Sequence, residues 1–145
     1  MKAVVGIASD HAGYGLKDYL KKVLEETDYK VVDFGTDSTE SMDYPDTAHP
    51  LAHAVENGEV DFGVAMCGTG NGIAITLNKH AGVRAGMGWS TEIAALAKRH
   101  NNANILVLPG RYVSFEEGKK ILFAFIEAEF EGGRHQRRID KINEK

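Results

Sequence analysis

Short apolar runs rich in β-branched residues alternate with segments of helical periodicity along the chain. The runs predict strands at 3–8, 31–35, 60–66, 83–87 and 103–109. Between them, apolar residues recur three and four positions apart, as Leu16, Leu20 and Leu24 do at spacings of four, which predicts helices. Because parallel strands need crossover connections, this alternation predicts an α/β domain with helices on both faces of a parallel sheet.

Several predicted helices carry their own start signals. Asp46 is placed to cap a helix that continues through Leu51, and Ser90 to cap the helix after the fourth strand. Ser114 and Glu117 form an S-x-x-E capping box before another apolar helical face. These signals support the strand and helix order read from the apolar pattern.

Composition narrows the class of protein. The 145 residues suffice for one domain with a substantial core. The single cysteine allows no internal disulfide, and no basic and apolar leader is visible, so we expect a cytoplasmic protein. No run approaches the ~20 apolar residues of a membrane span. With a net charge of −4 the chain lacks the basic surface typical of nucleic-acid binding, so we expect neither membrane nor nucleic acid as a partner.

Chemistry-bearing residues follow several of the predicted strands. Asp10 and His11 come after the first, the CGTGNG stretch at 67–72 after the third, and Arg111 after the fifth. Ligands of open parallel sheets bind at the carboxyl ends of the strands. We therefore expect these residues, together with those after the fourth strand, to meet at one edge of the sheet.

The CGTGNG stretch is expected to attract an anion. A glycine-rich turn between a strand and a helix presents several backbone N–H groups, and the helix N-terminus adds partial positive charge. The anion could be a nucleotide pyrophosphate, a sugar phosphate or an oxyanion that forms during a reaction. The spacing is not G-x-G-x-x-G and no G-K-[ST] follows, which disfavours the nucleotide.

Cys67 opens this stretch and allows two interpretations. Unpaired cysteines are among the most buried residue types, so Cys67 could simply be a small apolar residue that ends a strand. Beside backbone amides and a helix N-terminus a thiol ionises more readily, so Cys67 is also a candidate base or nucleophile. The position beside the amides favours the second interpretation. Asp10 and His11 could be a helix cap and a surface histidine, but a carboxylate and an imidazole at the same edge also suit proton transfer and phosphate binding.

Two pairs of residues elsewhere also have alternative readings. Arg134 and Arg138 share one face of a predicted exposed tail helix, at about 134–145. They are either a solvated face or, together with Arg111, a phosphate site. His100 and Asn101 end a helix, where a histidine is either favoured by the helix dipole or functional.

His49 and His53 have the i, i+4 spacing of a metal-binding pair. No carboxylate stands at the HExxH position, and the sequence shows no evident third ligand. We therefore assign no metal to this pair.

Seven segments read in order resemble the type B ribose-5-phosphate isomerases, a family that also includes galactose-6-phosphate and allose-6-phosphate isomerases. They are SDHAG at 9–13, DYPD at 43–46, CGTGNG at 67–72, NK at 78–79, RHNNAN at 99–104, GR at 110–111 and RHQRRI at 134–139. The resemblance covers almost all of residues 1–145. It implies a single domain with a Rossmann-like three-layer α/β/α sandwich around a five-stranded parallel sheet. It also implies a homodimer or dimer of dimers whose active sites are shared between chains, with the tail helix reaching the partner.

The resemblance further implies residue roles in converting ribose 5-phosphate to ribulose 5-phosphate, a reaction of the pentose phosphate pathway. Cys67 would move a proton between C1 and C2 through a cis-enediolate, and His100 would act as the acid that opens the sugar ring. The remaining roles are the oxyanion-binding amides of Gly68, Thr69, Gly70, Asn71 and Gly72, hydroxyl contacts from Asp10 and Thr69, pocket lining by Tyr44 and Asn101, and phosphate binding by His11, Arg111, Arg134 and Arg138. No metal or organic cofactor is expected.

The catalytic base and the substrate vary within the family. Some members of the family lack the cysteine and carry a glutamate base just after the last glycine of the loop, where this chain has Ile73, so we place it in the thiol subset. A hexose 6-phosphate would present the same C1–C2 chemistry, and a non-catalytic sugar-phosphate or nucleotide sensor is the alternative outside the enzymes.

Overall fold

The computed structural model describes residues 3–144 and contains one five-stranded sheet. Its strands are β1 (Val4–Ser9), β2 (Lys30–Asp33), β3 (Phe62–Cys67), β4 (Ala85–Met87) and β5 (Ile105–Pro109). Every neighbouring pair is parallel, and the order across the sheet is β2-β1-β3-β5-β4. The five strands predicted from the apolar runs are thereby confirmed.

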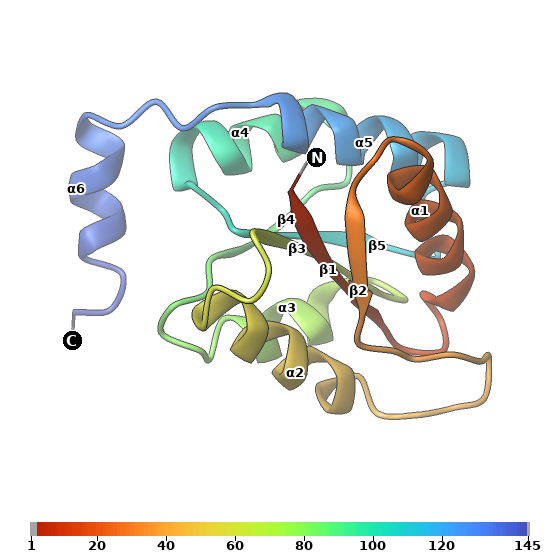
Figure 1. The fold of residues 1–145 in the computed structure, drawn as a ribbon. Helices are drawn as coiled ribbons and strands as arrows, with labels where there is room; N and C mark the ends of the chain where they lie inside the picture. Colours follow the sequence, from red (N-terminus) through yellow and green to blue (C-terminus); the bar gives the residue numbers. More distant parts are fainter. Residues whose placement is uncertain (1–2, 145) are drawn as a thin grey trace.

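Helices cover both faces of the sheet, as predicted. On one face lie α1 (Tyr14–Glu26), α4 (Thr91–Asn101) and α5 (Phe115–Glu127), and on the other lie α2 (Pro45–Glu56) and α3 (Asn71–Leu77) (Figure 1). The result is a three-layer α/β/α sandwich. Within residues 3–144, no helix is long and apolar enough to cross a membrane.

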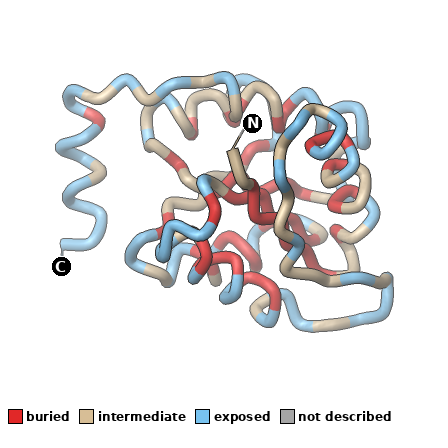
Figure 2. The backbone as a smooth tube through the Cα atoms, in the orientation of Figure 1, coloured by how far each residue is buried: buried red, intermediate tan, exposed pale blue. Residues whose placement is uncertain are grey.

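The alternation of side chains along the central strands divides the interior into two cores. Val64 and Met66 of β3 belong to the core beneath α1, α4 and α5, whereas Ala65 and Cys67 belong to the core beneath α2 and α3. The buried residues accordingly concentrate in the sheet and on the inner sides of the helices (Figure 2). Cys67 is thus an inward-facing residue at the carboxyl end of a central strand.

The predicted helix starts are mostly confirmed. The Ser90 hydroxyl accepts a hydrogen bond from the Ile93 amide, and Ser114 and Glu117 form the reciprocal capping box. The assignment of Asp46 as a cap is wrong. The helix begins at Pro45, two residues before the start that an Asp46 cap implies, and Pro45 needs no partner for an N–H group. Asp46 lies in the first turn, where its charge complements the helix dipole.

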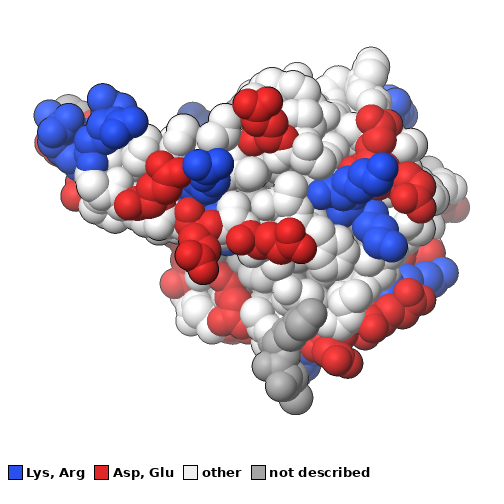
Figure 3. Space-filling view, turned by 90° about the horizontal axis from the view of Figure 1, so that it is seen from above, with Lys and Arg blue, Asp and Glu red and all other residues white. Residues whose placement is uncertain are grey.

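The last helix, α6 (Arg134–Asp140), stands apart from the sandwich at the end of an extended connection (Figure 1). Gly132 and Gly133, both with positive φ, precede it. Basic side chains gather at this projecting end of the molecule (Figure 3), and α6 itself carries Arg134, Arg137 and Arg138. The helix is shorter than predicted, because residues 141–143 form a turn; Lys145 lies outside the described residues.

Candidate active site

The carboxyl ends of β1, β3 and β5 open into a cavity of about 630 Å³, which we call the carboxyl-edge cleft. Residues that follow these three strands line it, together with the loop before α2. The lining residues are Asp10, His11, Ala12, Met42, Asp43, Tyr44, Pro45, Asp46, Gly68 and Arg111. The prediction that Asp10, His11, the glycine-rich loop and Arg111 meet at one edge is confirmed. Residues after β4, which were expected there too, do not line this cleft.

Asp10 holds the turn between β1 and α1 in place. Its Oδ1 accepts hydrogen bonds from the amides of Ala12 (3.0 Å) and Gly13 (3.1 Å), and its own amide donates to the carbonyl of Met66 (3.3 Å). The turn lies tightly against β3, because a Cβ at Gly13 would lie 2.6 Å from Met66 Cγ. The Asp10 carboxylate is therefore fixed at the junction of two strands, where it borders the cleft.

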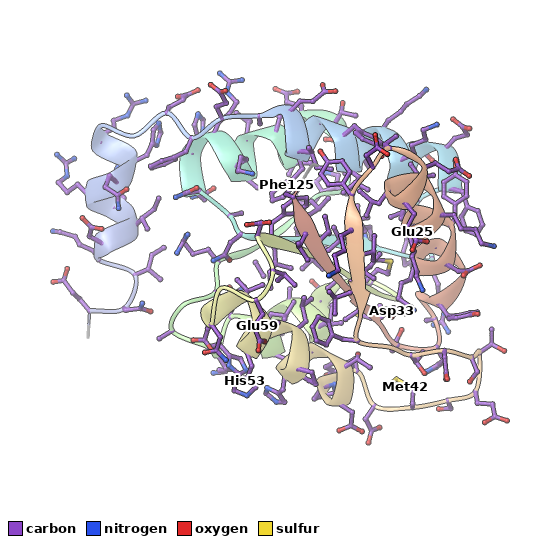
Figure 4. All side chains as sticks on the ribbon, viewed as in Figure 1. Glu25, Asp33, Met42, His53, Glu59 and Phe125 are labelled. Carbon is purple, nitrogen blue, oxygen red and sulfur yellow. The ribbon has the colours of Figure 1, made fainter. Side chains whose placement is uncertain are left out.

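His11 is oriented by the long loop between β2 and α2, on which Figure 4 labels Met42. The Met42 amide donates to Nδ1 of His11 at 3.2 Å. A neutral His11 ring with an accepting Nδ1 carries its proton on Nε2, which is then available as a donor. The sequence pattern did not reveal this contact, because Met42 is 31 positions from His11. The DYPD motif at 43–46, directly after Met42, was the one sequence signal near this loop.

The glycine-rich loop turns sharply from β3 into α3. Gly70 has a φ of +84° at the start of the helix, in the left-handed region that glycine adopts without steric cost. The Gly68 carbonyl accepts the Arg111 amide (3.0 Å), and the Cys67 carbonyl accepts the Gly110 amide (2.8 Å). The loop is thus anchored to the residues that follow β5, and Arg111 borders it.

Thr69 and Asn71 contribute to the loop from within. The Asn71 amide donates to the Thr69 hydroxyl at 3.2 Å, and both side chains are exposed. An anion bound at this turn would compete with the Thr69 hydroxyl for that amide. Thr69 therefore has a local role in shaping the loop besides any contact with a ligand.

Cys67 lies directly beneath this loop, as the last residue of β3, with 5% of its surface exposed. It packs in the core that contains Ile73 and Ala74 of α3. This burial agrees with the interpretation of Cys67 as a small apolar residue, and its position next to the amides agrees with the interpretation as a base. Ile73, at the position of the alternative glutamate, is fully buried.

The other predicted residues form a second group. His100, Asn101 and Arg138 line a cavity of about 380 Å³ between α4 and α6, the α4–α6 cavity, together with His135, Ile139 and Ile142. Arg134 is exposed on α6 and lines neither cavity. Within one chain the structure therefore brings Asp10, His11, Tyr44, Gly68 and Arg111 together, and separates them from His100, Asn101 and Arg138.

Charged neighbours organise the second group. The His100 ring stacks on His135 with centroids 4.4 Å apart, and Glu131 Oε1 lies 3.7 Å from Nε2 of His100 and 3.6 Å from Nε2 of His135. A hydrogen bond from Arg99 is the main cause that lowers the pKa of Glu131. Desolvation, followed by the charges of His100 and Arg134, lowers the pKa of His135. Sequence reasoning missed both Glu131 and His135.

Two groups of potential metal ligands occur among residues 3–144. One is His100, Glu131 and His135, in the α4–α6 cavity. The other is His53, Glu56 and His80, beside His49. The sequence-based statement that the His49 and His53 pair has no evident third ligand is therefore wrong, because the fold brings Glu56 and His80 to it.

Comparison with known proteins decides the family. The model of the family described as Ribose/Galactose Isomerase matches residues 5–142. The chain belongs to this family. It is 43% identical to ribose-5-phosphate isomerase B of Escherichia coli over 138 residues, covering 95% of this chain and 93% of the relative. The resemblance seen in the sequence motifs is confirmed.

Solved structures agree over the whole fold. The ribose 5-phosphate isomerase from Thermotoga maritima superposes with a TM-score of 0.98 at 45% identity, with complete coverage of both chains. Ribose-5-phosphate isomerase B from Mycoplasma genitalium, solved with bound ribulose-5-phosphate, superposes with a TM-score of 0.91 at 45% identity, covering 96% of this chain and 93% of that chain. The predicted fold class is thereby confirmed.

Proposed function

We propose that the protein is an aldose–ketose isomerase that interconverts ribose 5-phosphate and ribulose 5-phosphate in the cytoplasm. The observation that carries the proposal is the match, over nearly the whole chain, to a structure solved with bound ribulose-5-phosphate. The carboxyl-edge cleft supports it, because it combines a fixed carboxylate, an oriented imidazole, a glycine-rich loop and an arginine.

Cys67 is the proposed base. As a thiolate it removes the proton from C2 of the open-chain aldose, the C2 electron pair forms the cis-enediolate and O1 takes up a proton. Return of the proton to C1 and loss of the O2 proton then complete the ketose, so no external redox partner is consumed. The amides of the loop from Gly68 to Gly72 stabilise the enediolate oxygens; one such donor is typically worth 10²–10³ in rate.

The other proposed roles are divided between the residues at the carboxyl-edge cleft and those of the second group, at the α4–α6 cavity and on α6. Asp10 and Thr69 contact the sugar hydroxyls, and Tyr44 lines the cleft. His11 and Arg111 bind the phosphate from the same side. His100 opens the sugar ring and Asn101 lines the pocket; Arg134 and Arg138 complete the phosphate site.

A second copy of the chain would join the two groups. His100 and Arg138 line the α4–α6 cavity rather than the carboxyl-edge cleft of their own chain, and α6 projects from the sandwich with both arginines exposed. We therefore propose a single-domain homodimer, or a dimer of such dimers, in which α6 of each chain supplies its arginines to the cleft of the partner.

Substrate conversion tests the proposal. Proton NMR in deuterated water would follow ribose 5-phosphate, ribulose 5-phosphate, allose 6-phosphate and galactose 6-phosphate separately. We expect fast conversion of the pentose phosphates with deuterium exchange. Faster conversion of a hexose phosphate would leave the type of reaction unchanged and make a hexose phosphate the substrate. The family description names galactose besides ribose. Binding without conversion of any sugar would indicate a sensor.

A further inference from the structure

Three histidines and a glutamate gather on the outer surface where α2 meets the loop after α3. We call His49, His53, Glu56 and His80 the histidine cluster. His80 Nδ1 lies 3.2 Å from Glu56 Oε1, and His53 Nδ1 lies 3.9 Å from the same oxygen. His53 lies at the end of α2 remote from Met42, whose loop borders the carboxyl-edge cleft (Figure 4). The cluster is therefore separate from the candidate active site.

The spacing within the cluster suits a small transition-metal ion. One ligand atom from each of His53, Glu56 and His80 can be chosen so that all three lie within 4.8 Å of one another. Nitrogen and oxygen ligands about 2.0–2.1 Å from a tetrahedral Zn²⁺ lie roughly 3.3–3.4 Å apart. The 3.2 Å separation already fits, and the 3.9 Å separation needs only a small rotation of His53, whose side chain is 64% exposed.

In metal sites, the ligands are held in position by hydrogen bonds to a further layer of groups, here called outer partners. The ligands of the histidine cluster have such partners. The Gly82 amide donates to Glu56 Oε2 at 3.0 Å, leaving Oε1 directed at the two imidazoles. His80 Nε2 lies 2.7 Å from His49 Nδ1. With a metal ion on Nδ1, a neutral His80 carries its proton on Nε2 and can donate it to His49. The hydrogen bond from Gly82 is also the main cause that lowers the pKa of Glu56.

We propose that His53, Glu56 and His80 bind one divalent transition-metal ion of the Zn²⁺ type per chain, with His49 as the outer partner of His80. Two imidazoles and one carboxylate are a ligand set that zinc accepts, and the solvent-exposed side leaves room for water ligands. The ion links α2 to the loop after α3 and so stabilises the fold. His53 lies nine residues beyond Tyr44 on α2, about 14 Å at 1.5 Å per residue. Isomerisation therefore does not require the ion.

Calorimetric titration of EDTA-treated protein without an affinity tag tests the proposal. We expect the wild-type chain to bind one Zn²⁺, with an accompanying rise in melting temperature. His53→Ala is the primary variant, since an exposed side chain can be removed without disturbing the core. It should weaken Zn²⁺ binding by more than the ~10–100-fold typical for loss of an outer partner. Glu56→Gln should also weaken it, whereas Glu59→Gln, an equal change of charge at a nearby exposed site, should not.

The outcomes distinguish the histidine cluster from the other group of potential ligands, which is His100, Glu131 and His135. Zn²⁺ binding that persists in His53→Ala and is lost in Glu131→Gln would place the ion in the α4–α6 cavity and overturn the proposal. Failure of the wild-type chain to bind Zn²⁺ at millimolar concentration would overturn it as well. Isomerase activity should survive prolonged EDTA treatment, while the melting temperature of Zn²⁺-loaded protein should fall.

Discussion

The ring of Tyr44 lies against the Cα of Gly72, so that a Cβ on Gly72 would lie 2.5 Å from Cζ of the ring. Tyr44 comes from the loop before α2, and Gly72 from the first turn of α3. The contact therefore sets how the glycine-rich loop faces the carboxyl-edge cleft. It also ties two segments of the proposed substrate site to each other.

Gly72→Ala should displace Tyr44 and reduce kcat/KM, because even a misplacement of about 1 Å can cost 10² in rate. Gly15→Ala is the matched control, since a Cβ there would make only an ordinary 3.4 Å contact with Phe115. Steady-state kinetics of both variants would check the prediction. Equal activity in the two variants would mean that the Tyr44 contact does not position the site.

Arg138→Ala and Arg134→Ala should each raise KM about 10-fold or more, because a hydrogen bond to a charged group is typically worth about 1.5–3 kcal/mol. Arg137→Ala is the control, since Arg137 is an exposed neighbour on the same helix. Circular dichroism would verify that α6 and the fold persist. If all three variants keep the wild-type KM, the arginines form only a solvated face.

The buried Lys17 ammonium, 2% exposed, is paired with Asp33 at 2.6 Å. Burial raises the pKa of Asp33, but hydrogen bonds from Lys17 and the Gly35 amide and the charges of Lys17 and Lys21 outweigh that effect, so its pKa is lowered. Asp33 thus stabilises the fold at pH values above its unfolded-state pKa of about 3.9. That stability is lost as the pH falls through the lower folded-state pKa.

Asp33→Asn should therefore lower the free energy of unfolding by about 3 kcal/mol at pH 7, because it leaves Lys17 buried without a counter-charge. The difference from the wild-type chain should shrink as the pH drops below about 4. Urea unfolding at several pH values would measure both effects. A difference that does not change with pH would contradict the assigned role of the Asp33 charge.

Local pattern was sufficient to predict most of the fold. The five strands, the Ser90 cap and the Ser114–Glu117 box depend on residues close together in sequence, so their signals are complete within a few positions. Asp46 was misread as the cap because the helix already begins at Pro45, which places Asp46 inside its first turn. A cap signal alone does not fix the first helical residue when a proline competes.

The site was predictable only in part, because several of its contacts join distant positions. The Met42 amide reaches His11 across 31 residues, and His80 reaches Glu56 across 24. Motifs identified the chemical groups but not their partners. A motif also does not indicate whether two residues line the same cavity. Arg111 lines the carboxyl-edge cleft, whereas Arg138 lines the α4–α6 cavity.

Mixed dimers test whether active sites are shared. In a heterodimer of Cys67→Ala and His100→Asn chains, one site would combine two intact residues and the other two altered ones. Random exchange makes half of the dimers mixed, so mixing the two inactive variants should restore about a quarter of wild-type activity. No recovery in demonstrably mixed dimers would mean that Cys67 and His100 act within one chain.

Deuterium exchange by the Cys67→Ala variant tests the central claim most directly. Proton NMR in deuterated water would follow exchange at C2 and conversion of ribose 5-phosphate, while a binding measurement checks the affinity for the sugar. The account predicts that kcat falls by about 10²–10⁴, the usual contribution of a general base, with little change in binding. A folded Cys67→Ala variant that exchanges and converts the sugar at the wild-type rate would contradict the assignment of Cys67 as the base.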